Sequence, residues 1–183
     1  MLPEGEILAH QAIVRGARKR PLWTAGPDTR EIAWGRPVIE RLVRHRDPFL
    51  LVDELTAIDL TQGAIRGRRR IDPDDPLFTG HFPGAPVYPG VLQLEIMGQL
   101  GLCLLPCAAA GSTDLPRGDA PGDVRALGIH HAQFLAPVGP GDSLDILARV
   151  LDRDDYTAVC SGQLMRGTTV VSLAIVEVYF VGE

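Results

Sequence analysis

The stretch VLQLEIMGQLGLCLL, residues 91–105, is apolar around nearly the whole circumference of a helix. Gln93, Glu95 and Gln99 are the polar side chains within it. A helix that is hydrophobic on all sides is buried in a core and does not lie on a surface. Pro106 follows directly and predicts the end of the helix. The fold therefore has to enclose one long apolar helix.

Strand-like runs lie on both sides of this helix. Residues 49–59 (FLLVDELTAID) and 64–71 (AIRGRRRI) flank a Thr-Gln-Gly turn and predict a hairpin. Four more runs, separated by turn sequences at meander spacing, cover residues 125–138, 142–152, 156–166 and 168–181. An antiparallel sheet wrapped around the helix is the economical way to cover it. We therefore expect an α+β fold of the hotdog type.

The chain is expected to form one domain with an N-terminal extension. Its 183 residues are enough to bury a sizeable core. Residues 1–36 are turn-rich and weakly patterned, and we interpret them as the extension. Residues 37–183 then form a single hotdog domain that opens with a short helix at Pro37. Pro- and Gly-rich composition predicts long loops at residues 72–90 and 108–123.

Composition and charge are those of a soluble globular protein. Hydrophobic residues make up 45% of the chain and charged residues 22%. The formal net charge of -5 gives no general attraction to nucleic acid or to an anionic membrane. The start, MLPEGEILAH, is acidic where a secretory signal would be basic, and the apolar run from residue 100 to 111 is too short to span a bilayer. We therefore expect a cytoplasmic protein without membrane insertion.

The three cysteines, Cys103, Cys107 and Cys160, lie in apolar surroundings. Their number is odd, and they form no CxxC pair and have no histidine at metal-ligand spacing. We expect them to be buried small hydrophobic side chains, with neither a disulfide framework nor a zinc site.

Glu95 and Gln99 are four residues apart, so they lie on one face of the predicted helix. A carboxylate in an apolar setting costs several kcal/mol unless it is paired or protonated. Such a residue is expected to have a function. The alternative is that Glu95 points to solvent at an edge of the sheet.

His81 precedes the helix within TGHFPGAPVYPG, residues 79–90. The prolines and glycines there stiffen the loop and allow close backbone approach, as the positioning of a base requires, although a purely structural turn has the same composition. Gly90 stands where the helix begins, so its N–H has no partner inside the helix and can dock a substrate carbonyl. A base, an acid and a carbonyl-polarising donor can remove a proton next to a carbonyl and expel a group from the next carbon.

Three segments resemble the beta-hydroxyacyl-acyl-carrier-protein dehydratases of fatty acid synthesis. They are HRDPFLLVDEL (residues 45–55), GHFPGAPVYPGVLQLEIMGQ (residues 80–99) and AQFLAPVGPGDSL (residues 132–144). The resemblance extends over residues 37–181 and keeps the spacing between His81 and Glu95.

The resemblance implies a reaction and a role for each motif residue. His81 corresponds to the catalytic histidine, and Glu95 to the acidic partner supplied by the other subunit of a homodimer or dimer-based oligomer. Gly90 corresponds to the glycine whose amide polarises the thioester carbonyl, and Gln99 to a glutamine that holds the acid or a water. The implied reaction is loss of water from a 3-hydroxyacyl thioester to give a trans-2-enoyl product. It needs no metal or organic cofactor.

Some features depart from the family pattern. The family members are shorter at the N-terminus and lack most of the loop near residues 111–123. Tyr88 stands where a methionine is usual, so we predict that it lies beside the substrate and reshapes the acyl tunnel. A specialised lipid or polyketide pathway is therefore as plausible as primary fatty acid synthesis. Glutamate at position 95 resembles the branch that only dehydrates and differs from the branch that also isomerises the double bond.

The resemblance also implies an acyl carrier protein as partner. Because such carriers are acidic, we expect a basic docking patch. Two clusters are candidates, although either can be an ordinary solvated face: Arg66, Arg68, Arg69 and Arg70, and Arg15, Arg18, Lys19 and Arg20. Two other functions remain open. A hotdog thioesterase has no use for His81 in HFPG, and a non-catalytic acyl-carrier-binding protein has no reason to keep all four motif residues.

Overall fold

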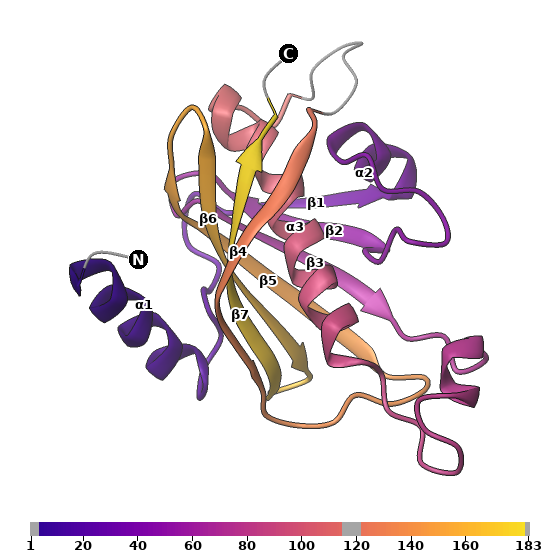
Figure 1. Ribbon diagram of the computed structural model, residues 1–183. Coiled ribbons are helices and arrows are strands. Elements are labelled where there is room, and N and C mark those ends of the chain that lie inside the picture. Colours follow the sequence, from indigo (N-terminus) through magenta and orange to yellow (C-terminus); the bar gives the residue numbers. More distant parts are fainter. Residues whose placement is uncertain (1–3, 115–121, 182–183) are drawn as a thin grey trace.

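The computed structural model describes residues 4–114 and 122–181 of the chain. The helices and strands are α1 (Glu4–Ala17), β1 (Arg30–Gly35), α2 (Arg36–Leu42), β2 (Glu54–Asp59), β3 (Ala64–Arg70), the 3-10 helix η1 (Pro76–Thr79), α3 (Gly90–Ala110), β4 (Val124–Phe134), β5 (Ser143–Arg153), β6 (Thr157–Arg166) and β7 (Thr169–Phe180). The strands form one antiparallel sheet in the order β1-β2-β3-β5-β6-β7-β4, with α3 on one side and α1 on the other (Figure 1). The predicted sheet wrapped around one long helix is confirmed.

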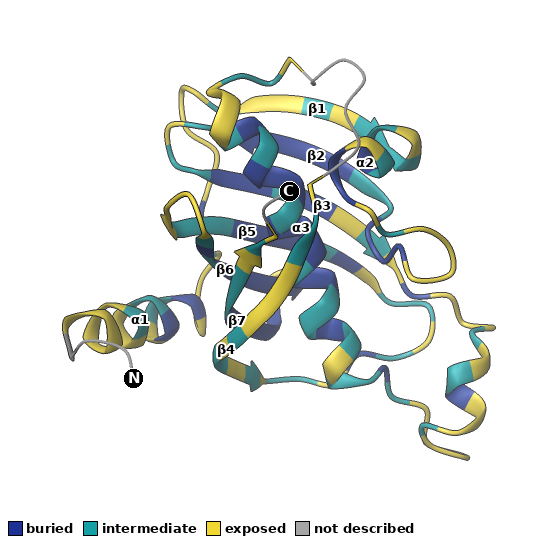
Figure 2. Ribbon diagram, turned by 45° about the horizontal axis from the view of Figure 1, so that its top comes forward, coloured by how far each residue is buried: buried dark blue, intermediate teal, exposed yellow. Residues whose placement is uncertain are grey.

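The core lies between α3 and the concave face of the sheet. Buried side chains of α3 pack against buried residues of β2, β3, β5, β6 and β7. The buried segments of these elements are dark blue in Figure 2. On α3 these are Ile96, Met97, Leu100, Cys103, Leu104 and Cys107. The helix has the length and composition of a membrane span, but it is the buried helix of a folded core. The three cysteines are buried, as predicted, and burial raises the pKa of Cys160 to about 12.

The prediction that α3 ends at Pro106 is wrong, because the helix continues to Ala110. One proline removes a single backbone hydrogen bond, and the packed core holds the helix through it. The helix ends where Gly111 adopts a left-handed conformation with φ of 60°. The N–H groups of Gly111 and Ser112 then donate to the carbonyls of Ala108 and Cys107, the pattern of a Schellman motif. The loop predicted at residues 108–123 therefore starts only after Ala110, and residues 115–121 of it lie outside the described residues.

The strand predicted over residues 49–59 is shorter, because β2 begins at Glu54. Residues 50–53 are buried or half-buried, whereas Phe49 is 49% exposed, and residues 49–53 have no strand structure. Gln99 of α3 takes the place of a neighbouring strand, since its side chain accepts a hydrogen bond from Leu51 N and donates to Phe49 O, both at 2.8 Å. The Gln99 side chain thus makes the backbone hydrogen bonds that the sequence pattern predicted for a neighbouring strand.

Residues 1–36 contain two elements that the sequence analysis did not predict, α1 and the edge strand β1. The sheet therefore begins within the stretch interpreted as an extension. The convex face of the sheet is covered by this stretch, with Val14, Ala17 and Trp23 packed in an apolar cluster on it. Buried Gln163 of β6 donates to Ala17 O at 2.6 Å and Arg20 O at 2.9 Å, and accepts from Leu22 N at 2.8 Å.

Candidate active site

The loop between η1 and α3 positions His81. Its backbone closes on itself, because His81 N donates to Leu77 O at 2.9 Å and Val87 N donates to His81 O at 3.0 Å. The imidazole Nδ1 lies 2.8 Å from Val87 O. A carbonyl oxygen only accepts hydrogen bonds, so Nδ1 carries the proton. This tautomer leaves Nε2 with a free lone pair, as a general base requires.

Gly90 is the first residue of α3. Among the described residues, its N–H has no hydrogen-bond acceptor, and it lies at the positive end of a helix of 21 residues. A Cβ on Gly90 would approach the Phe134 ring to 2.7 Å, so a side chain here would require that ring to move. The free amide at a helix start is suited to polarise a carbonyl oxygen.

Glu95 lies one and a half turns further along α3, with its side chain 32% exposed. Its Oε1 accepts a hydrogen bond from Gln99 Nε2 at 2.9 Å and lies 3.2 Å from His45 Nε2. The contact with His45, aided by the Gln99 amide, lowers the pKa of the Glu95 carboxyl against the opposing effect of burial. The carboxylate is therefore held in one place and kept charged near neutral pH.

His45 is the member of this group that the sequence analysis did not single out. It lies after α2, and its ring stacks on Phe49 with centroids 6.3 Å apart. The histidine is part of the HRDPF segment, which carries part of the family resemblance. Nothing in the sequence around His45 points to Glu95, 50 positions later.

A cleft of about 490 Å³ begins at His45 and follows the C-terminal half of α3. Its walls are mainly apolar, with charged side chains at the rim. The lining includes Leu42, Val43, Leu102, Leu105, Pro106 and Phe180. An apolar cleft that starts beside the candidate acid can take an alkyl chain.

The described residues place His81 and Glu95 in two separate groups within one chain. His81 contacts Val87 and stacks on Phe82, whereas Glu95 contacts His45 and Gln99, and no hydrogen bond or ion pair joins the two groups. No cluster of three or more metal-ligating side chains is found in the described part of the chain.

Tyr88 is buried, with 2% of its surface exposed. Its ring lies 6.3 Å from that of Phe78, and its backbone N–H donates to Val138 O at 2.7 Å. Burial raises the pKa of the Tyr88 hydroxyl. Tyr88 lies in the loop between His81 and Gly90, and its side chain faces the core. A contact between Tyr88 and substrate stays a prediction.

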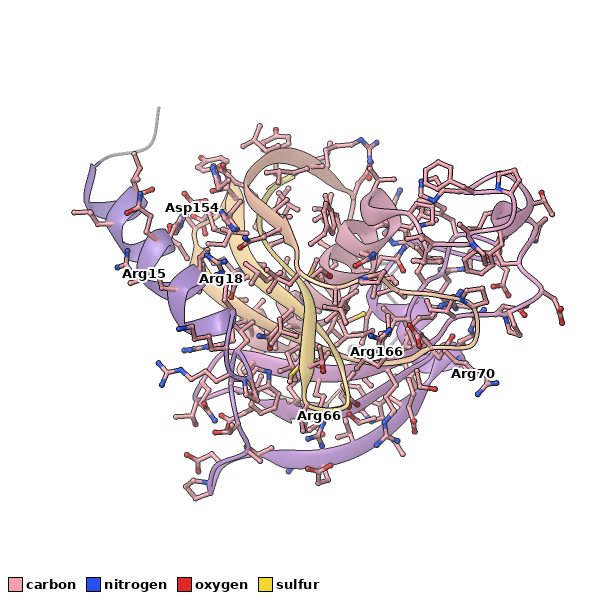
Figure 3. The ribbon with its side chains drawn as sticks, turned by 90° about the horizontal axis from the view of Figure 1, so that it is seen from below. Arg15, Arg18, Arg66, Arg70, Asp154 and Arg166 are labelled. Carbon is pink, nitrogen blue, oxygen red and sulfur yellow. The ribbon has the colours of Figure 1, made fainter. Side chains whose placement is uncertain are left out.

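The basic cluster of residues 66–70 is divided between two environments. Arg69 is 12% exposed and bound to Asp53 at 2.9 Å, and Arg66 is bound to Glu31 at 3.0 Å. Arg68 is 63% exposed, and Arg70 is exposed at the end of β3. Figure 3 shows Arg70 on the far side of the sheet from Arg15 and Arg18 of the N-terminal cluster.

Known families and sequences include proteins similar to this chain. A family model described as a FabA-like domain matches residues 43–174. The 3-hydroxyacyl-[acyl-carrier-protein] dehydratase FabZ of Sulfurimonas denitrificans is 37% identical over 136 residues, which are 74% of this chain and 89% of that protein. FabZ of Chlamydia trachomatis is 39% identical over 110 residues, 60% of this chain and 68% of that protein.

Solved structures support the fold. The dehydratase heterocomplex ApeI:P from Xenorhabdus doucetiae matches with a TM-score of 0.61 and 17% identity, over 79% of this chain and 91% of that one. An uncharacterised protein from Pyrococcus horikoshii matches with a TM-score of 0.53 and 13% identity, over 79% and 93%. At these identities the likeness concerns the fold alone.

Proposed function

Since the chain belongs to the FabA-like family, we propose that it removes water from 3-hydroxyacyl thioesters carried on acyl carrier protein and forms trans-2-enoyl thioesters. The observation that carries this proposal is the tautomer of His81, whose Nε2 is free to accept a proton, on a loop that leads directly to the free amide of Gly90. The relatives named FabZ act on substrates of this class.

The mechanism uses acid–base chemistry and one fixed dipole. His81 Nε2 takes the proton from C2, and the Gly90 N–H together with the α3 dipole stabilises the negative charge that develops on the thioester oxygen. The C2–H electron pair forms the double bond, and the C3–O bond breaks. Glu95 directs a proton to the departing hydroxyl, which leaves as water. These groups supply the whole reaction, so we propose no cofactor.

The proposed enzyme is a dimer with shared active sites. His81 and Glu95 belong to separate groups within one chain, and we propose that a second subunit brings a base to each acid. β4 supports this proposal, because it is an edge strand of the sheet and exposes Leu127 (58%) and Ile129 (60%), as Figure 2 shows for the strand as a whole. An exposed apolar edge is suited to pair with a second copy.

The substrate tail and the cellular setting complete the proposal. The cleft that begins at His45 is proposed to hold the acyl chain beyond C3. Gln99 is proposed to fix the Glu95 carboxyl group, and Tyr88 to shape the loop from within the core.

We propose that the protein is soluble and cytoplasmic, because the long apolar helix in the described part of the chain is the buried core helix. The product is proposed to enter fatty acid or specialised lipid synthesis without isomerisation.

A direct assay tests this function. Purified protein is incubated with 3-hydroxyacyl thioesters of several chain lengths on acyl carrier protein, and mass spectrometry follows loss of water. We expect an enoyl product with the wild type, none with His81→Ala or Glu95→Gln, and normal turnover with the remote control His10→Ala. Free acid would mean a thioesterase, and carrier binding without a product would mean a binding protein.

A further inference from the structure

The proposed dehydration uses Glu95 but gives no role to the contact between His45 and Glu95. Hydroxide is a poor leaving group, so the 3-hydroxyl must receive a proton as the C3–O bond breaks. Glu95 is the group proposed to deliver it, yet its surroundings favour the charged carboxylate, which has no proton to give. The site therefore needs a proton source next to Glu95.

The geometry places a titratable side chain at that position. His45 Nε2 is 3.2 Å from Glu95 Oε1, and both side chains are largely shielded, with exposed fractions of 26% and 32%. Unperturbed histidine titrates within the physiological range, and a neighbouring carboxylate favours its charged form. The pair can thus hold one proton between two groups.

The other ring nitrogen of His45 makes no hydrogen bond with the described residues that would fix the tautomer. Its Nδ1 is buried and has no hydrogen-bond partner among the described residues. No second hydrogen bond therefore fixes the tautomer, in contrast to His81, whose Nδ1 is bound to Val87 O. A proton can leave Nε2 and return without breaking a bond at Nδ1. Stacking on Phe49 keeps the ring in place meanwhile.

The remaining charges around His45 come from its own segment and from the cleft that it lines. Arg44 and Arg46 flank it in the chain, and Asp123, Arg125 and Arg153 belong to the rest of the cleft. Asp123 forms an ion pair with Arg125 and lies 4.0 Å from Arg44. Glu95 is therefore the carboxylate in contact with the imidazole among the described residues.

We propose that His45 is a positioning residue that holds the Glu95 carboxyl group and supplies, through it, the proton that leaves with the 3-hydroxyl. As His81 takes the C2 proton, Glu95 protonates the departing hydroxyl and receives the Nε2 proton of protonated His45. Water leaves, Glu95 is again a carboxylate, and His45 is neutral. His81 then loses a proton to solvent and His45 gains one, which restores the starting state. This role rests on the proposed dehydration.

Kinetics of two variants test the proposal. His45→Gln keeps a hydrogen-bond donor but cannot titrate, and His45→Ala removes both functions. We expect kcat to fall about a hundredfold in both variants, the order of effect that general acid–base groups contribute, with KM within about twofold of the wild type. The pH dependence of kcat should change in His45→Gln, because glutamine cannot take up or release a proton at this position. His10→Gln, on α1, is the matched control.

Two outcomes overturn the proposal. A His45→Ala enzyme with wild-type kcat would remove any role for the residue, and a His45→Gln enzyme with wild-type kcat and an unchanged pH profile would remove the proton supply. The Glu95 carboxyl pKa, followed by NMR of carboxyl-labelled protein, is measured alongside and should rise in His45→Gln. This titration does not depend on turnover. If the wild type dehydrates no 3-hydroxyacyl thioester, the proposed function fails, whereas an unchanged Glu95 titration in the variant defeats the pairing with His45.

Discussion

The Phe134 ring at the end of β4 lies so close to Gly90 that a Cβ on this glycine would come within 2.7 Å of it. The edge strand of the sheet thus packs directly against the start of the helix that carries the acid. The absence of a side chain at Gly90 leaves room for this ring.

Substitution of Gly90 should therefore damage both stability and activity. In Gly90→Ala, the Phe134 ring, which is 49% exposed, has to shift, and a side chain forced off its preferred rotamer costs about 0.5–1.5 kcal/mol in free energy of unfolding. We expect kcat to fall at least about tenfold, because a displaced amide no longer faces the thioester oxygen. Urea unfolding and steady-state kinetics measure the two effects. The double variant Gly90→Ala with Phe134→Ala should recover stability, and failure to do so would show that the ring is not the obstacle.

The Glu95 carboxyl group should make stability depend on acid pH. Its pKa is lowered in the folded chain, so the unfolded chain takes up this proton first as the pH falls. The stabilisation is present above the unfolded pKa, near 4.5, and is lost as the pH falls through the lower folded value. We expect urea unfolding between about pH 6 and 3 to show a steeper loss for the wild type than for Glu95→Gln. Parallel curves would mean that Glu95 is not paired in solution.

Gln99 should contribute to folding as well as to the site. Its amide pairs Leu51 N, Phe49 O and Glu95 Oε1 at once. In Gln99→Leu these groups lose their partner, at about 1–3 kcal/mol for each group that stays buried and unpaired. Activity should fall with stability, because the carboxyl group is no longer held. If thermal denaturation shows an unchanged midpoint, the segment from Phe49 is held by other contacts.

Carrier docking should depend on the exposed members of the basic cluster and not on its buried members. Arg68 and Arg70 face solvent, whereas Arg69 is bound to Asp53. We expect charge reversal at Arg68 and Arg70 to raise KM for carrier-bound substrate about tenfold, with little change for a small thioester analogue. The same reversal at Arg15 and Arg18 tests the N-terminal cluster. An equal loss with both substrates would show that the reversed residues act on structure.

The three hydrogen bonds between the Gln163 side chain and the N-terminal backbone should stabilise the whole chain. In Gln163→Leu, the carbonyls of Ala17 and Arg20 and the N–H of Leu22 lose their partner. Each group that stays buried costs about 1–3 kcal/mol. The matched control is Gln11→Leu on the exposed side of α1. We expect a lower denaturation midpoint for the first variant alone, and equal midpoints would indicate that the N-terminal segment adds no stability.

Most of the fold could be predicted from the sequence, because α3 is apolar on nearly all sides and the later strands are strand-like runs separated by turn sequences. Two kinds of feature could not. The N-terminal helix α1 buries only a few side chains, including Val14 and Ala17, so its pattern is weak. The backbone of residues 49–53 looks like a strand, but its partner is the Gln99 side chain, which no periodicity reveals.

The candidate site also contains residues that the sequence predicted and residues that it did not. His81, Gly90 and Glu95 lie within one continuous motif of the chain, so the chemistry of the residues and their spacing pointed to all three. His45 precedes Glu95 by 50 positions and meets it only through tertiary packing. The cleft beyond it is also formed by distant segments, and its presence could not be read from any one of them.

The hydrogen bond from Gln163 to Ala17 joins residues 146 positions apart. During synthesis from the N-terminus, residues 4–22 therefore emerge long before the strand that receives them. Their contacts with Gln163 can form only after β6 has joined the sheet. Closing so long a loop costs entropy that only the completed sheet offsets, so docking of this segment is expected to be a late step in folding.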